Sequence, residues 1–401
     1  MIGECRAGPF PTGYGGKVAI KKAICRHVML YWRMPPSRVM LPNQRSMGYA
    51  GMRRDLTNIQ QLRGIAASVV MLAHVIQSAQ KRAIGDDSFL INGTIGVDIF
   101  FVISGFIMVG VTHQAFGMPG SSTTFLKRRA IRIVPIYWIY TLFFVVLFAA
   151  SGKFATIHDL IFSLLFIPYD AEGKLRPVLG AGWTLNFEML FYVAFAASLF
   201  FRRKIGIALL FLSLIILVAF GLLHPPGVLF WWSRPIILEF LVGVIVGIAY
   251  HASRSPVQLP APLLMIALLT TGWIISSRIF GMTDALAWRP AEWLLAGGIV
   301  TIAVFSRQTR GESLFASALV NLGDWSYSLY LLHIIVLLIA AKISDTIFGK
   351  TLPIWVAAVY AISVMSLSIL LAFLSYRYIE RPSERWLRRV WVTKTPKLVP
   401  A

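Results

Sequence analysis

The sequence predicts an all-α, polytopic membrane protein of about ten transmembrane helices, with both termini on the cytoplasmic side. Of its 401 residues, 57% are hydrophobic and only 14% are charged. Soluble domains carry roughly 45–50% apolar and about 25% charged residues. The apolar residues of this chain gather in runs of about 20 with few charges inside them. A helix of that length spans a hydrocarbon core of about 30 Å at about 1.5 Å per residue.

Residues 1–53 are expected to form a basic, disordered arm on the cytoplasmic face. This stretch is polar and rich in Gly and Pro, and its one short apolar piece lies at 28–32. It fits neither a secretory signal nor a transmembrane segment. Cys5 and Cys25 both lie here, so the membrane body offers no disulfide framework and no thiol nucleophile. A chain that starts at Met52 is expected to insert and to work.

The membrane domain is expected at 54–382 and a basic cytoplasmic tail at 383–401. Each predicted helix corresponds to one apolar run, and a shorter run at 160–167 is expected to lie at the membrane interface. The predicted helices are 59–79, 92–112, 133–150, 183–201, 205–223, 231–250, 262–277, 291–305, 325–341 and 353–376.

The distribution of basic residues predicts the orientation. Lys and Arg concentrate in the two terminal segments and in alternate loops, such as 127–132 and 202–204, and the opposite loops hold fewer. This bias is typical of cytoplasmic segments. The net charge of +21 therefore indicates topology, and because no basic block interleaves with aromatic residues, nucleic-acid binding is not expected.

Five ionisable residues in the predicted helices stand out: His74, Asp98, Glu188, Glu239 and His333. A charge at the bilayer centre costs about 2.5–3.5 kcal/mol on insertion scales, so such residues often mark functional sites. Each one alone could equally be a packing contact paired with a neighbour. Five of them across five helices favour a buried polar site. Their spacing matches no metal-ligand pattern, and no metal site is predicted.

Arg63 and His74 lie eleven residues apart on the first helix. That separation is about 16 Å along the axis and almost a whole number of turns, so both share one face. Arg63 could hold an anion at the cytoplasmic end, and the imidazole of His74 could transfer protons deeper in the membrane. The alternative is that Arg63 only flanks the helix and His74 is a satisfied core histidine, which spacing alone favours.

Arg129 and Arg132 are three residues apart and share a helix face at the cytoplasmic edge of the membrane. Guanidinium groups suit phosphate because they donate two parallel hydrogen bonds. Contact with lipid headgroups explains the same pair equally well.

Six short motifs follow one another along residues 54–382. They are Leu62-Arg63-Gly64 followed by His74; GVDIFFVISGF at 96–106; Arg129 and Arg132 followed by Pro135 and Tyr137; WTLNFE at 183–188 followed by Phe191-Tyr192; SYSLYLLH at 326–333; and Glu380-Arg381-Pro382. In this order they resemble the acyltransferase 3 family of membrane acyltransferases. Thr184 stands where that family commonly has Ser, and it keeps a hydroxyl. The sequence Asn186-Phe187-Glu188-Met189 resembles that of the family branch that acylates secreted exopolysaccharides.

The resemblance implies an O-acyltransferase of the bacterial inner membrane that has no permanently bound cofactor. The donor it implies is acyl-CoA, most often acetyl-CoA. The acceptors it implies are extracytoplasmic or lipid-linked polysaccharides, O-antigens, cell-wall glycans or small molecules, and membrane lipids are the remaining partners.

On this hypothesis Arg63, Arg129 and Arg132 bind the CoA phosphates, and the thioester reaches His74. His74 takes the proton of a sugar hydroxyl or briefly carries the acyl group, and the sequence leaves both routes open. Glu188 and Asp98 orient His74 or the acceptor. The supporting residues are His333, Glu239, Tyr330 and Trp183.

Two other functions would also use buried charges. A proton-coupled transporter would relay protons through the embedded His and carboxylate residues. It does not explain why Arg63 accompanies Arg129 and Arg132 at the inner edge. A lipid-linked sugar flippase or a glycan synthase subunit is the third interpretation. An acyltransferase releases the free thiol of CoA when it is given donor and acceptor, and the other two classes do not.

Overall fold

The computed structural model describes residues 56–85, 93–150, 152, 154–171, 174–175, 177–253, 265, 268–269, 271–272, 289–308 and 313–392. Within these ranges the regular secondary structure is helical, apart from one antiparallel pair of two-residue strands, β1 (Asp170–Ala171) and β2 (Lys174–Leu175). The all-α prediction is thus confirmed for the described chain. The expected arm at 1–53 and most of the predicted helix at 262–277 lie outside the described residues.

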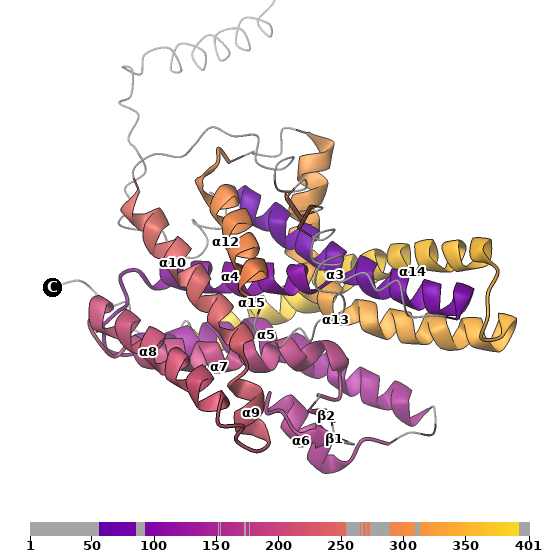
Figure 1. Ribbon diagram of the computed structural model, residues 1–401, viewed down its shortest axis with the longest axis horizontal. Coiled ribbons are helices and arrows are strands. Elements are labelled where there is room, and N and C mark those ends of the chain that lie inside the picture. Colours follow the sequence, from indigo (N-terminus) through magenta and orange to yellow (C-terminus); the bar gives the residue numbers. More distant parts are fainter. Residues whose placement is uncertain are drawn as a thin grey trace, which may run out of the picture. The chain divides into compact units, whose positions relative to one another are not determined.

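Helices of very different lengths follow each other along the chain (Figure 1). They are α3 (Thr57–Ile84), α4 (Thr94–Thr112), α5 (Ser121–Ala149), α6 (Ile157–Leu164), the 3₁₀ turn η2 (Gly180–Gly182), α7 (Trp183–Ser198), α8 (Arg203–Gly221), α9 (Val228–Trp232), the 3₁₀ turn η3 (Pro235–Leu238), α10 (Glu239–Ala252), α12 (Pro290–Phe305), α13 (Leu314–Phe348), α14 (Ile354–Ser375), the π-helical η4 (Tyr376–Glu380) and α15 (Arg381–Trp391).

Seven helical segments among the described residues are long and apolar enough to cross a membrane. They are Thr57–Ile84, Thr94–Thr112, Ser121–Ala149, Arg203–Gly221, Pro235–Ala252, Leu314–Phe348 and Ile354–Trp391. The chain is therefore a multi-pass membrane protein. The total of about ten spans and the cytoplasmic placement of both termini remain predictions.

Two helices begin well before their predicted starts. α5 starts at Ser121 and not at 133, and α13 starts at Leu314 and not at 325. The first turns of α5 are polar, but Ser122 donates a hydrogen bond of 2.6 Å to the carbonyl of Ala196, which ties them to α7. The side chain of Ser313 caps α13 by accepting from the amide of Ala316 at 3.1 Å. Hydropathy marks only the apolar part of such helices. Their polar first turns are helical as well, because caps and side-chain hydrogen bonds stabilise them.

Glycines allow two pairs of helices to cross closely. A Cβ atom built on Gly323 of α13 would lie 1.8 Å from the carbonyl oxygen of Gln60 in α3. A Cβ built on Gly243 of α10 would lie 1.9 Å from the carbonyl oxygen of Val102 in α4. Small residues at such crossings let membrane helices pack backbone to backbone. α14 also packs against α3 and α13, and these three helices run side by side (Figure 1).

Stacked phenylalanines hold α4, α7 and α10 together. The ring centroid of Phe240 lies 4.4 Å from that of Phe101 and 4.3 Å from that of Phe191, and all three side chains are buried. Offset stacking of this kind adds about 0.5–1.5 kcal/mol per pair beyond the burial of apolar area. The aromatic core fixes the helix faces that carry Ser104 and Glu188.

Candidate active site

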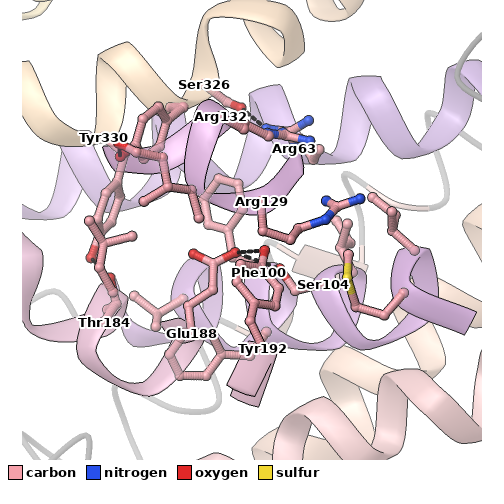
Figure 2. Close-up of a pocket in the computed structure, with 18 residues that line it drawn as sticks. Arg63, Phe100, Ser104, Arg129, Arg132, Thr184, Glu188, Tyr192, Ser326 and Tyr330 are labelled. Atoms are coloured by element: carbon pink, nitrogen blue, oxygen red, sulfur yellow. Dashed lines mark hydrogen bonds between the residues drawn. The ribbon is translucent and has the colours of Figure 1, made fainter. Parts of the chain in front are cut away.

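One cavity collects most of the polar residues that the motifs contain (Figure 2). It lies among α3, α4, α5, α7 and α13, and the centre of a water-sized molecule can reach about 80 Å³ of it. We call it the site cavity. Its polar lining is Arg63, Ser104, Arg129, Arg132, Thr184, Glu188, Tyr192, Ser326, Tyr327 and Tyr330.

The three predicted donor-binding arginines all line this cavity, although Arg63 lies on another helix than Arg129 and Arg132. Arg63 donates to the hydroxyl of Ser326 at 3.0 Å and to the amide oxygen of Gln60 at 3.3 Å. These bonds fix its guanidinium at the junction of α3 and α13. The guanidinium of Arg129 lies over the ring of Tyr192, 5.8 Å from the centroid. Figure 2 shows the three guanidinium groups gathered in one part of the cavity.

Glu188 shares the cavity with these arginines. One of its oxygens, Oε1, accepts hydrogen bonds from Ser104 at 3.1 Å and from Tyr192 at 2.5 Å. Two hydroxyl donors on one carboxylate oxygen hold the group in a fixed orientation. Of the described residues that line the cavity, Glu188 is the only carboxylate. It therefore places an acidic group at a fixed point close to a strongly positive surface.

His74 lies in a histidine pair beside the cavity. Its Nδ1 is 2.9 Å from the carbonyl oxygen of Val70 and 3.4 Å from Nε2 of His333. Nδ1 of His333 is 3.0 Å from the carbonyl oxygen of Leu329. Tyr330 connects this pair to the cavity, because it lines the cavity and its ring centroid lies 6.0 Å from that of His333.

The contacts of the histidine pair decide its tautomers. A carbonyl oxygen can only accept, so Nδ1 must carry the hydrogen in both neutral rings. Nε2 of His74 then holds the lone pair and can act as a base. Nε2 of His333 can accept from Nδ1 of His74 and would stabilise the positive charge that His74 gains on protonation.

Asp98 lies in a different cluster from Glu188. Arg289 is 3.5 Å from a carboxylate oxygen of Asp98, donates to Thr94 at 2.6 Å and pairs with Glu292. Glu239 lies next to Asp98 in this cluster. The sequence predicted one buried polar site for Asp98, Glu239 and Glu188. The structure places Asp98 and Glu239 in a separate cluster with Arg289.

Several residues of these two regions were not anticipated. Arg289, which directly precedes α12, is one of them: its side chain is 3% exposed and paired with acids. The hydroxyls of Ser104 and Ser326 belong to the quoted motifs, and only the packing of the helices turns them toward Glu188 and Arg63.

The other predicted supporting residues occupy the cavity wall and its surroundings. The hydroxyl of Tyr330 lies 3.0 Å from that of Thr184 on α7. Trp183 packs edge-on against Phe187, with ring centroids 6.2 Å apart. Among the described residues, no group of three or more His, Cys, Asp or Glu residues is placed to hold a metal ion.

Comparisons with known proteins identify relatives of this chain. Residues 56–373 match a family described as an acyltransferase domain. The chain is 35% identical over 302 residues to an exopolysaccharide production protein, ExoZ, of Rhizobium meliloti, covering 72% of this chain and 89% of that protein. It is 23% identical to the acyltransferase MdmB of Streptomyces mycarofaciens, over 89% of this chain and 95% of the relative. It is 25% identical to a putative peptidoglycan O-acetyltransferase, YrhL, of Bacillus subtilis, over 72% of this chain and 50% of the relative. No solved structure matches.

Proposed function

This chain belongs to the acyltransferase 3 family of membrane O-acyltransferases, and from that premise we propose that it moves an acyl group, most often acetyl, from cytoplasmic acyl-CoA to a hydroxyl of an extracytoplasmic or lipid-linked polysaccharide. The observation that carries the proposal is the convergence of Arg63, Arg129 and Arg132 in one cavity next to the pair of His74 and His333. The first group suits phosphates, and the second suits proton transfer.

The donor binds through the arginines. The phosphates of CoA rest on Arg129 and Arg132, and Arg63 binds farther along the donor. Along α3, His74 is about 16 Å beyond Arg63 by helical rise. An extended pantetheine arm can cover a distance of that order, which places the thioester near His74. Glu188, held by Ser104 and Tyr192, orients the bound donor or the acceptor hydroxyl within the cavity.

The transfer step follows from the tautomer of His74. Nε2 takes the proton of the acceptor hydroxyl, and the acceptor oxygen attacks the carbonyl carbon of the thioester. The new C–O bond forms, the C–S bond breaks, and the sulfur leaves with the electron pair and takes the proton back from His74. His333 accepts from Nδ1 of His74 at 3.4 Å and stabilises the intermediate imidazolium.

The membrane arrangement completes the proposal. About ten spans, both termini in the cytoplasm and a place in the bacterial inner membrane would bring the arginines to the cytoplasmic supply of acyl-CoA. The similarity to an exopolysaccharide production protein supports a secreted polysaccharide as acceptor. Asp98 and Glu239 act in this scheme as a buried ionic contact with Arg289 between α4, α10 and α12.

The test is an assay of thiol release with purified protein in lipid nanodiscs. Acetyl-CoA and an undecaprenyl-linked or soluble exopolysaccharide fragment are supplied together, and free CoA thiol and acetylated glycan are measured. We expect both products to appear in equal amounts and only when donor and acceptor are both present. Proton-coupled movement of a solute without thiol release would instead identify a transporter.

A further inference from the structure

A second cavity lies at the start of α5 and shares Arg129 and Arg132 with the site cavity. The centre of a water-sized molecule can reach about 350 Å³ of it. The first turns of α5 form part of its wall, and α15 contributes Arg388. We call it the α15 cavity. Because the two cavities share two residues, a long ligand could occupy both.

The lining of the α15 cavity is strongly positive. Arg128, Arg129 and Arg132 on α5 and Arg388 on α15 all line it, and the described lining includes no carboxylate. Glu384 offsets part of the charge of Arg388, and an anion placed among the four guanidinium groups would be attracted by all of them. Phosphate suits them because each guanidinium can donate two parallel hydrogen bonds. Apolar side chains such as Met118 and Phe125 complete the wall of this cavity.

Arg388 is held in position and does not belong to a loose tail. Its Nε and Nη2 donate to Oε1 of Glu384, one turn earlier, at 2.9 and 2.6 Å. α15 is itself anchored at its start, where buried Glu380 accepts a hydrogen bond of 2.6 Å from Ser328 of α13. A side chain that is ordered before binding loses less entropy when it takes up a ligand.

We propose that the nucleotide end of the acyl-CoA donor binds in the α15 cavity, with Arg388 as a phosphate-binding residue and Glu384 as the residue that positions it. This inference rests on the proposed function and extends its donor site to the C-terminal helix. The phosphates of CoA then lie between Arg388 and the shared pair Arg129 and Arg132, the pantetheine arm continues into the site cavity, and the acyl end lies farthest from α15. The segment expected to be a simple basic tail thus completes the donor site.

The experiment compares two thioesters in the full-length protein. Acetyl-CoA carries the nucleotide, and S-acetylpantetheine lacks it. Arg388→Ala should raise KM for acetyl-CoA about tenfold or more, because a charged hydrogen bond to phosphate is lost. KM for S-acetylpantetheine should stay at its wild-type value. Adenosine 3′,5′-bisphosphate should inhibit wild type competitively and Arg388→Ala about tenfold more weakly.

Three further variants test whether the effect of Arg388→Ala comes from the lost phosphate contact. Arg388→Lys keeps the charge and should fall between wild type and Arg388→Ala. Glu384→Gln weakens the anchor of Arg388 and should raise KM for acetyl-CoA by a smaller factor. Arg389→Ala, an exposed neighbour outside the cavity lining, should behave as wild type. If Arg388→Ala fails to fold, the lysine and glutamine variants still decide the question with the same two thioesters.

The possible results separate this inference from the proposed function. An unchanged KM for acetyl-CoA in Arg388→Ala, with an active wild type, would overturn the role of α15 and leave the acyltransferase proposal standing. An equal rise in KM for both thioesters would also overturn it, because the effect would then not depend on the nucleotide. A wild type that turns over neither thioester would overturn the proposed donor, and this inference with it.

Discussion

His74→Gln removes the proposed base and leaves the helix intact. Glutamine is a good helix former and keeps hydrogen-bonding capacity, so α3 should still insert and pack. The amide cannot take a proton. In wild type, Nδ1 of His74 faces the carbonyl of Val70 at 2.9 Å, which leaves Nε2 as the only basic atom of the ring.

The expected size of the effect follows from this single function. Removal of a general base typically costs about 10²–10⁴-fold in rate, which is about 2.7–5.4 kcal/mol at about 1.36 kcal/mol per factor of ten. The loss should fall on kcat, since the donor arginines are on other turns and other helices. His333→Gln should cost less, because His333 contacts His74 and not the reacting atoms.

The assay is acetyl transfer by purified protein at saturating donor and acceptor. His158→Gln serves as the matched control, because this histidine lies on α6 and its side chain is 61% exposed. Binding of a non-hydrolysable acetyl-CoA analogue should be the same in His74→Gln and wild type. Near-normal turnover by His74→Gln would refute the reasoning and leave His74 as a packing residue next to His333.

Three other changes test the cavity and the fold. Arg129→Lys and Arg132→Lys keep charge but lose the bidentate fork, so KM for acetyl-CoA should rise about tenfold with a smaller change in kcat; unchanged KM would point to a topology signal only. Glu188→Gln should lower kcat strongly. Its thermal stability should stay close to wild type, since Ser104 and Tyr192 can still donate to the amide oxygen of the glutamine. Wild-type turnover with a lower Tm would instead make Glu188 a structural contact. Gly323→Ala should lower the free energy of unfolding by about 1–3 kcal/mol in a thermal-shift measurement, because the new Cβ would meet the backbone of α3. Gly298→Ala is the control and should be neutral, because no atom lies within 4 Å of a Cβ built there.

Local periodicity by itself predicted the apolar parts of most described helices and how residues within one helix are spaced. The apolar runs predicted the membrane helices, because length and hydropathy are properties of each segment alone. The pairing of Arg129 and Arg132 followed from the same rule, since residues three apart share a helix face. The eleven-residue interval from Arg63 to His74 likewise set their distance along α3.

Contacts across helices were decided only by the tertiary structure. Arg63 meets Ser326, and His74 meets His333, across 263 and 259 residues of sequence. Asp98 joins Arg289 across 191 residues, although its motif gave no reason to separate it from Glu188. The choice of neighbour depends on which faces pack, and that depends on close crossings such as Gly323 against Gln60. The periodicity of one helix does not specify how a neighbouring helix is rotated about its axis or how far it is shifted along the membrane normal.

The C-terminal segment shows the same division most clearly. Its basic composition predicted a cytoplasmic tail, and charge count alone could say no more about it. The structure continues α14 through η4 into α15 and brings Arg388 to the cavity at the start of α5. Sequence therefore predicted the apolar helical segments and showed which segments carry charge. Packing decided which charges share a cavity, because a cavity is formed by side chains from several helices at once.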